Sequence, residues 1–457
     1  MELINRSIIC IDLKSFFASC ECVVRGLDPF TTPLVVADPA QKGALTLAVT
    51  PYLKAKGIKS RGRVYEIPES INYIKIPPHM RLYQKMSKDV IKTYLEFVSI
   101  DDIHIYSIDE CFLDVTDYLK MYKTDAYELA KTIINKVYDN TKLTVTAGIG
   151  PNMLLAKVAM DIEAKHVKDN IAVWTYDDIQ TKLWSITPLS KMWGIGINME
   201  RNLNELGLYS IGDIAKYNIN KLKKRFGIMG EELWYHANGI DNTLIKDANS
   251  MESKEKSFSR SQVLFKDYYG YNIPIILYET CNILARELRT NKVTTSLISL
   301  GIKYNRHIGG GFHHSMKIDN PIDNENKIYD YVMYMFDRYY ENNNPIRMIS
   351  IGCGKLSDNS NYQINIFEDF NKVVKDKSMD NAVDSIKNKF GPNSILKASS
   401  LLSDSTIKER NGKIGGHAAW VGHHLIQSLI IVILWVILKK KNLILTNLNI
   451  LKNNLKN

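Results

Sequence analysis

The sequence lacks the cysteine patterns that hold structural metals or disulfide frameworks. Its 457 residues include six cysteines, and none of them forms a Cys-x-x-Cys pair or a zinc-type spacing. This absence excludes a zinc finger and a disulfide-stabilised secreted domain. We expect reduced, mostly buried thiols of a cytosolic protein at Cys10, Cys20, Cys22, Cys111, Cys281 and Cys353.

An export signal and a full-length membrane span are also missing. The first seven residues, Met-Glu-Leu-Ile-Asn-Arg-Ser, contain no basic region followed by an apolar core. We therefore expect the protein to stay in the cytoplasm. The most apolar stretch, residues 425–438, has fourteen residues, whereas a helix that spans a bilayer needs about 20.

Residues 416–457 form an atypical apolar and basic C-terminal extension with two interpretations. One is a weak membrane anchor, because residues 439–457 contain five lysines and no acid, as expected of a cytoplasmic flank. The other is an appended tail outside the folded protein, for example from a shifted reading frame. The shortness of the apolar stretch favours the appended tail.

Basic residues outnumber acidic ones. The chain is also longer than a typical single domain. Lys and Arg total 59 against 49 Asp and Glu, which gives a formal net charge of +10. This excess fits a polyanionic partner such as nucleic acid, although many basic proteins bind none. The length predicts roughly three or four domains.

Strand-like and helix-like segments alternate over the first third of the chain. The strand-like segments are 7–12, 34–37, 103–108, 112–115 and 143–149, and the helix-like segments are 15–24 and 124–140. Residues 184–240 show short helical patterns, and 257–367 again mix strands and helices. Residues 370–415 are polar with weak periodicity, so we expect little independent structure there. The overall pattern predicts a multidomain α+β protein.

Three acidic residues lie at the ends of predicted strands. Asp12 ends the first strand, and Asp109 and Glu110 lie between two later strands. Carboxylates at such positions can bind the magnesium ions that phosphoryl transfer requires. By themselves they are weak evidence, because adjacent acids in a turn are usually solvated.

The sequence segments around these acids resemble the motifs of a known protein family. Three segments resemble successive motifs of the Y-family DNA polymerases, namely Ile-Asp-Leu-Lys-Ser-Phe-Phe-Ala-Ser-Cys-Glu (11–21), Tyr-Ser-Ile-Asp-Glu-Cys-Phe-Leu-Asp-Val-Thr (106–116) and Ala-Gly-Ile-Gly-Pro-Asn-Met-Leu-Leu-Ala-Lys-Val-Ala (147–159). Their order and separation also match the family. The resemblance extends to about residue 370 and is greatest to UmuC/DinB-type repair polymerases of Gram-positive bacteria and their phages.

The resemblance implies an α+β right-hand polymerase with a separate α+β little-finger domain. The implied divisions are a palm (1–27 and 81–175), small fingers (28–80), a helical thumb with a helix-hairpin-helix (176–245), a little finger (255–360), a polar tail with a clamp-binding peptide (361–415) and the extension 416–457.

The resemblance also assigns roles at the catalytic centre. Asp12, Asp109 and Glu110, with the backbone carbonyl of Leu13, would hold two Mg²⁺ ions, for which Mn²⁺ can substitute. Phe17 falls at the steric-gate position, where an aromatic ring collides with a ribose 2′-OH. Phe16 would line the same nucleotide pocket.

Basic residues are implied to contact the triphosphate. Lys157 matches a family lysine that approaches the phosphates. The segment Thr-Pro-Tyr-Leu-Lys-Ala-Lys-Gly (50–57) departs from the usual Tyr-x-Ala-Arg pattern. Lys54 is the best match to the arginine of that pattern, with Tyr52 as its neighbour. Lysine in place of arginine loses the bidentate geometry, so weaker phosphate binding is expected.

Three further segments are implied to bind macromolecules. Gly194 and Gly196 would let backbone N–H groups approach a DNA phosphate. Ser257, Ser259 and Arg260 would contact the template backbone. Gln363, Ile366 and Phe367 resemble the peptide by which bacterial polymerases dock on the sliding clamp.

The resulting prediction is an error-prone translesion DNA polymerase of an SOS-type damage response. It would act as a monomer on primer-template DNA and dNTPs, and no segment resembles a proofreading exonuclease. Two other hypotheses remain open from the residues. A nucleotidyl cyclase could use a similar carboxylate pair, and a catalytically silent relative could bind damaged primer ends without extending them.

Overall fold

The computed structural model describes residues 3–38, 43–250, 257–341, 343–358 and 370–411. The chain divides into two compact units, Met1–Glu252 and Ser253–Ala418. The division falls between the ranges expected for the thumb and the little finger. The predicted clamp peptide (Gln363, Ile366 and Phe367) and the extension 416–457 lie outside the described residues.

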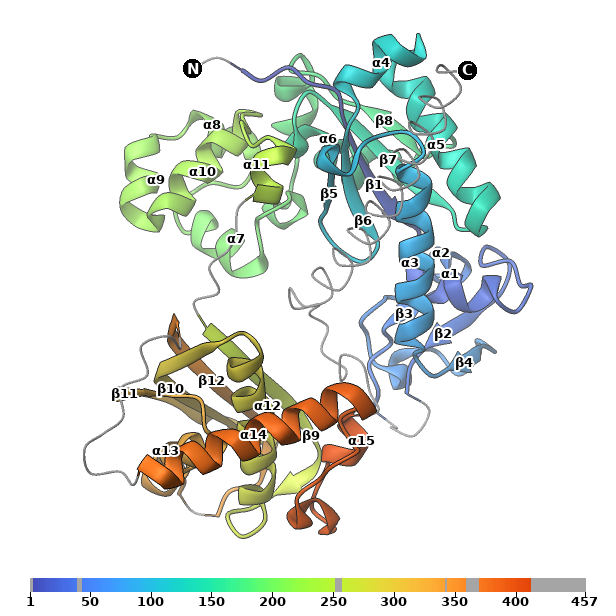
Figure 1. The fold of residues 1–457 in the computed structure, drawn as a ribbon. Helices are drawn as coiled ribbons and strands as arrows, with labels where there is room; N and C mark the ends of the chain where they lie inside the picture. The colour runs from blue at the N-terminus through green and yellow to red at the C-terminus, as the bar shows by residue number, and fades with distance from the viewer. Residues whose placement is uncertain (1–2, 39–42, 251–256, 342, 359–369, 412–457) are drawn as a thin grey trace, which may run out of the picture. The chain divides into compact units, whose positions relative to one another are not determined.

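A five-stranded sheet forms the centre of the first unit, in the order β5-β6-β1-β7-β8 (Figure 1). The strands are β1 (Ile8–Leu13), β5 (Ile103–Ile105), β6 (Glu110–Asp114), β7 (Val145–Gly150) and β8 (Ile171–Val173). β1 pairs antiparallel with β6 and β7, whereas β7 and β8 are parallel. These strands confirm the expected α+β core, and β6 begins at Glu110 itself.

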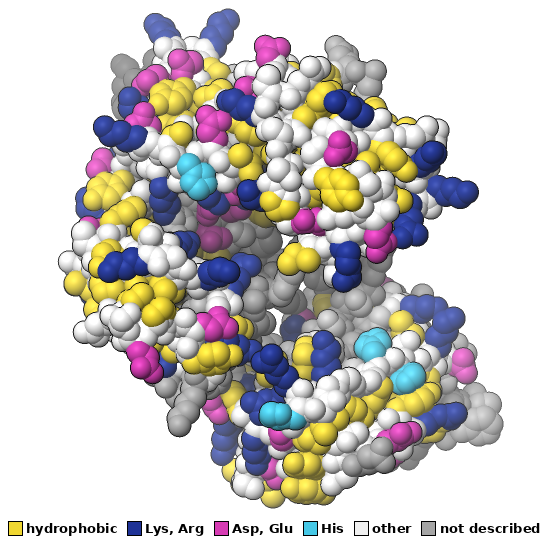
Figure 2. Space-filling model, turned by 180° about the vertical axis from the view of Figure 1, so that it is seen from behind, with side chains coloured by type: hydrophobic (Ala, Val, Ile, Leu, Met, Phe, Trp, Pro, Cys, Tyr) yellow, Lys and Arg dark blue, Asp and Glu magenta, His cyan; other side chains and the backbone are white. Residues whose placement is uncertain are grey.

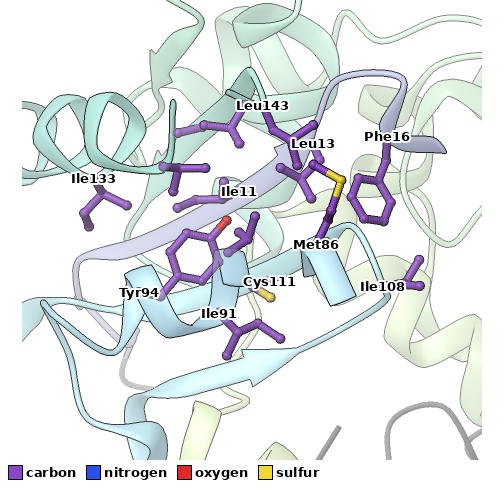
Figure 3. Packing of buried hydrophobic residues seen from close by; sticks show 14 of the residues in the cluster. Ile11, Leu13, Phe16, Met86, Ile91, Tyr94, Ile108, Cys111, Ile133 and Leu143 are labelled. Atoms are coloured by element: carbon purple, nitrogen blue, oxygen red, sulfur yellow. The ribbon is translucent and has the colours of Figure 1, made fainter. Parts of the chain in front are cut away.

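Opposite faces of β1 pack against different helices, because side chains alternate along a strand. Ile9, Ile11 and Leu13 belong to the larger core, which also includes residues of α3 (Met80–Tyr94) and α5 (Ala126–Thr141) (Figure 3). Ile8 and Cys10 pack on the other side, with residues of α6 (Met153–Ala159). Asp12 continues this second face and is therefore directed toward the α6 side.

Glycine allows α6 to lie unusually close to β7. A Cβ built on Gly148 would lie 2.1 Å from the carbonyl oxygen of Ala156 and 2.3 Å from the amide nitrogen of Met160. Both contacts are with backbone, which cannot move without displacing the helix. Gly148 therefore sets the distance between the sheet and the helix that carries Lys157.

A smaller three-stranded sheet, ordered β3-β2-β4, occupies the range expected for the fingers. It comprises β2 (Leu34–Val36), β3 (Ala48–Val49) and β4 (Ile74–Ile76). The short helix α2 (Pro51–Ala55) begins with proline, which is favourable in the first helical turn. α1 (Phe16–Val23) follows β1 directly and contacts α3, β2 and β3.

Short helices make up the rest of the first unit. They are α4 (Thr116–Tyr122), α7 (Ile197–Asn204), α8 (Ile211–Lys216), α9 (Ile219–Phe226), α10 (Ile228–Ala237) and α11 (Ile245–Ser250). The expected helical pattern of residues 184–240 is confirmed. The core of this segment includes residues of α6 and β8, so the helices pack directly on the central sheet region.

The second unit is a four-stranded antiparallel sheet with helices on one face. The sheet order is β11-β10-β12-β9, formed by β9 (Ser257–Tyr268), β10 (Val293–Tyr304), β11 (Gly311–Ile322) and β12 (Ile346–Asp358). α12 (Ile273–Thr290) and α13 (Glu325–Tyr339) supply the apolar side chains that cover the sheet. The predicted α+β character of this region is confirmed.

The expectation of little structure after residue 370 is wrong for residues 370–411. They form α14 (Phe370–Phe390) and α15 (Ile407–Asn411). Arg289 of α12 binds Asp384 of α14 at 2.7 Å, and Lys397 binds Glu325 of α13 at 2.9 Å. The segment is held by ion pairs rather than by an apolar stripe, so hydrophobic periodicity does not reveal it.

All six cysteines are buried and free, as expected. Among the described residues, no helix combines the length and the apolar character needed to cross a bilayer.

Candidate active site

Asp12 and Glu110 face each other across neighbouring strands. They are Cα partners in the β1–β6 ladder, so both side chains emerge on the same face of the sheet. The Leu13 N–H donates to the Asp109 carbonyl at 3.0 Å, which ties the third predicted ligand to the end of β1. The fold thus brings Asp12 beside the adjacent pair Asp109 and Glu110, which follows much later in the sequence.

An alternating chain of charges links these carboxylates to α6 and the residues that follow it. Glu110 Oε2 lies 2.9 Å from Lys157 Nζ, which lies 3.0 Å from Asp161 Oδ2. Asp161 Oδ1 lies 2.7 Å from Lys165 Nζ, which in turn lies 3.0 Å from Asp12 Oδ2. Asp12, Glu110 and Asp161 therefore each have an ammonium partner, which offsets the cost of placing these acids together in a poorly solvated site.

Burial makes the carboxylates harder to ionise. Loss of water raises the pKa of Glu110 to about 7, and Lys157 only partly opposes this shift. The pKa of Asp12 is also raised, first by burial, while Lys165 lowers it and Asp109 raises it. Carboxylates that repel each other in this way are suited to hold divalent cations, which remove the repulsion.

The donor set fits Mg²⁺ in chemistry, but the side chains do not form a ready-made cage. Throughout the described ranges, no three His, Cys, Asp or Glu side chains lie close enough together to hold a metal ion. Asp12 and Glu110 are directed to lysines, and Asp109 accepts a 2.6 Å hydrogen bond from the Ser107 hydroxyl. Magnesium binding would require carboxylates to exchange these partners for the ion.

The two adjacent phenylalanines occupy different environments. Phe16 is 3% exposed and packs in the large core beside Leu13 and Met86 (Figure 3). Phe17 is partly exposed, and its ring stacks on Tyr83 with a centroid distance of 4.3 Å. Of the pair, Phe17 is the ring that a ligand can reach.

The structure distinguishes between the predicted phosphate contacts. Lys157 is 6% exposed and bound to two carboxylates. Lys54 is exposed at the end of α2. Neighbouring protein atoms still remove enough water from its ammonium to lower its pKa, and the charges of Asp12 and Asp109 oppose that shift. Tyr52 instead lies under the ammonium of Lys56, 4.5 Å from its ring centroid.

Lys165 is a candidate that inspection of the sequence missed. Its side chain is 37% exposed, so it is more accessible than Lys157, and it touches Asp12 directly. A π-helical turn, η3 (Met160–Ala164), separates it from α6. Such turns occur often at functional sites, but they cannot be recognised from residue types alone.

The predicted hairpin of the thumb has an open backbone. Gly194 has a φ of +86°, which favours glycine, and a Cβ on either Gly194 or Gly196 would meet nothing within 4 Å. Gly196 caps α7 without a side-chain hydrogen bond, and Ile197 is 81% exposed. Backbone N–H groups at this helix start are accessible to an anion.

The predicted template contacts on β9 separate onto two faces. Ser257 and Ser259 lie on the face without helices, opposite Gly354 and Gly352 of β12. Figure 2 shows this side of the unit, where Lys, Arg and His side chains border an area of uncharged side chains and backbone. Arg260 is directed to the other face and binds Glu287 of α12 at 2.7 Å. The structure does not bring Arg260 together with the two serines.

Comparison with known proteins supports one family over most of the chain. Residues 11–161 match the impB/mucB/samB family, residues 255–366 match its C-terminal domain, and residues 190–241 match the thumb domain of DNA polymerase-iota. UvrX of Bacillus subtilis (strain 168), which its name assigns to UV-damage repair, is 40% identical over 417 residues, or 90% of this chain and 98% of UvrX.

DNA polymerase IV 2 of Bacillus subtilis (strain 168) is 31% identical over 420 residues, or 90% of this chain and 99% of that protein. Among solved structures, a Y-family DNA polymerase chimera of Dbh and Dpo4 shares the fold, with a TM-score of 0.61 and 22% identity. The match covers 77% of this chain and 100% of the chimera. The chain therefore belongs to the impB/mucB/samB family and is a Y-family DNA polymerase of the UmuC/DinB type.

Proposed function

We propose that this protein is an error-prone translesion polymerase that extends a primer 3′-OH with dNTPs opposite damaged template bases. The observation that carries the proposal is the pairing of Asp12 with Glu110 on one sheet face, where Lys157 and Lys165 neutralise them. The names of UvrX and DNA polymerase IV 2 support the same conclusion.

Asp12, Asp109 and Glu110, with the Leu13 carbonyl, are the residues that would hold two Mg²⁺ ions. When bound, these ions supply the charge neutralisation that an in-line attack on a triphosphate needs. The lysines have a different task. Lys165 and Lys54 are accessible ammonium groups near the carboxylates and are suited to bind the triphosphate as point charges.

The sugar of the incoming nucleotide is selected by rejection. Phe17 presents one face of its ring, while Tyr83 supports the other. A ribose 2′-OH would collide with such a ring, whereas deoxyribose would not. Phe16 contributes to this arrangement from the core and not as a surface of the pocket.

DNA binding is assigned to both units separately. The open backbone at Gly194 and Gly196 would bind one phosphate, and the serine-bearing face of β9 would contact the template backbone. Residues Gln363, Ile366 and Phe367 remain the proposed contact with a sliding clamp. The proposed setting is the cytoplasm, with the protein as a monomer.

A primer-extension assay with Mg²⁺ tests the proposal. Wild-type protein should extend a primer by template-directed incorporation, and the double variant Asp109→Ala with Glu110→Ala should not. A matched control replaces another adjacent acidic pair, Glu231→Ala with Glu232→Ala on α10, and should retain extension. Undiminished extension by the first double variant would refute the carboxylate assignment.

The same assay distinguishes the two other hypotheses. Template-independent conversion of a nucleoside triphosphate to a cyclic product would identify a nucleotidyl cyclase. Tight binding of primer-template DNA with no extension by wild-type protein would identify a silent DNA-binding relative.

A further inference from the structure

One of the buried carboxylates outside the catalytic cluster lies on α1. Glu21 is fully buried, and both of its oxygens have partners. Oε1 accepts a 2.6 Å hydrogen bond from the Tyr83 hydroxyl and lies 2.8 Å from His79 Nδ1, while Arg25 binds Oε2. Burial of an ionised carboxylate destabilises the fold unless the carboxylate is paired in this way. The presence of this buried network suggests that it has a role beyond packing.

The hydrogen bond to Glu21 fixes the position of the Tyr83 ring. The residue is fully buried on α3, and its hydroxyl also accepts the His79 backbone N–H at 3.1 Å. Burial and the bond to Glu21 raise the pKa of Tyr83 far above its usual value. The phenol therefore stays protonated and keeps donating to Glu21, which fixes where the ring lies.

The fixed ring is the surface on which Phe17 rests. The two rings stack with planes 14° apart and centroids 4.3 Å apart, and Phe16 meets Tyr83 edge-on at 6.4 Å. Phe17 and Glu21 lie four residues apart on α1, so they project from the same side of the helix. The contacts thus form a closed loop from α1 to Tyr83 and back to α1.

We propose that Glu21 and Tyr83 are positioning residues for sugar selection, because they prevent the Phe17 ring from moving away from the sugar of the incoming nucleotide. This inference rests on the proposed polymerase function and on Phe17 as the ring that rejects ribose. Rejection by collision works only if the ring cannot retreat. A retreat of a few tenths of an ångström already relieves much of a steric overlap, so the support behind the ring matters as much as the ring.

Full-length variants and the ratio of kcat/KM for dNTP to that for the matching rNTP test the inference. Tyr83→Phe keeps the ring and removes its bond to Glu21, so it should lower the ratio by about tenfold, the order that a bond to a charged group supports. Efficiency with dNTP should change little. The matched control is Tyr118→Phe, which removes a 2.7 Å phenol bond to Asp102 elsewhere in the same unit and should leave the ratio unchanged.

Conservative replacement and a double variant separate positioning from general destabilisation. Glu21→Gln keeps an acceptor for the phenol and should retain more discrimination than Glu21→Ala. Phe17→Ala should lose most discrimination, and adding Tyr83→Phe to it should lower the ratio no further. A general loss of packing would instead add to the effect of Phe17→Ala.

The outcomes distinguish this inference from the proposed function. If Phe17→Ala loses discrimination while Tyr83→Phe and Glu21→Ala keep the wild-type ratio, the positioning role is refuted and the gate stands. If Phe17→Ala keeps the ratio, the gate and its supports are both refuted, although polymerase activity stands. If wild-type protein does not extend primers, the proposed function itself fails.

Discussion

Replacement of Lys157 by methionine tests whether this lysine is a structural partner of Glu110. The two side chains are 8% and 11% exposed, and Lys157 Nζ lies 2.9 Å from Glu110 Oε2. Methionine preserves the apolar stem but leaves the carboxylate uncompensated, so Glu110 is forced to take up a proton on folding. The variant should therefore be less stable, and the loss should depend on pH.

The size of the loss follows from the pKa of Glu110. Its ordinary value is 4.5, and burial already raises the pKa to about 7 with Lys157 present. Up to about pH 7 both proteins fold with Glu110 neutral at the same cost, so the extra loss in the variant appears only above pH 7 and grows by about 1.4 kcal/mol per pH unit, to about 1.4 kcal/mol at pH 8 and about 3 kcal/mol at pH 9. The sign is fixed because the folded variant binds the Glu110 proton more tightly than folded wild-type protein does: the variant loses stability relative to wild type as pH rises above 7, and this part of the loss vanishes below about pH 6.

Urea unfolding followed by tryptophan fluorescence measures this loss. Four of the six tryptophans lie at positions 174, 184, 193 and 234, within the first unit, so the signal reports on that unit. Lys131→Met is the control, because its 3.9 Å pair with Glu128 is exposed and should contribute at most about 1 kcal/mol. The double variant Lys157→Met with Glu110→Gln should recover most of the loss. A loss independent of pH, or no recovery in the double variant, would refute the reasoning.

Three further predictions concern other parts of the molecule. Gly148→Ala should lower the unfolding free energy by about 3 kcal/mol in the same urea assay, because its Cβ would lie 2.1 Å from the Ala156 carbonyl oxygen. Gly43→Ala is the control and should not lower the unfolding free energy, because a Cβ on Gly43 would meet nothing within 4 Å. Equal stabilities of the two variants would contradict the close packing of α6 on β7. Lys165→Ala should raise the KM for dNTP about tenfold, and an unchanged KM would exclude a phosphate contact. Arg289→Met should cost the second unit about 3 kcal/mol or more and abolish amide protection in α14 during hydrogen exchange; retained protection would show that the ion pairs do not hold the helix.

Local patterns in the sequence were sufficient for the outline of the fold. Runs of β-branched and apolar residues located the strands that carry Asp12 and Glu110, because side-chain alternation and strand length are local properties. The family motifs then pointed to the three carboxylates and Phe17 as candidate site residues. These assignments depend on residues that are neighbours in the chain.

Alternation along β9 could have revealed the separation of Arg260 from Ser259. Residues one apart in a strand point to opposite faces, so the two could not share one DNA-facing surface. The burial pattern of β9 and the 2.7 Å pair of Arg260 with Glu287 show this directly.

Other features depend on contacts between residues far apart in the chain, and no local pattern carries them. The register of β1 against β6 and the closeness of α6 to Gly148 decide that Lys157 is enclosed by carboxylates. The π-helical turn decides that Lys165 reaches Asp12. Helix α14 has no apolar stripe in its sequence. Ion pairs that form only in the folded chain, such as Arg289 with Asp384, hold it in place. Charge pairing and close backbone packing are set by three-dimensional distances, so they become visible only once the chain has folded.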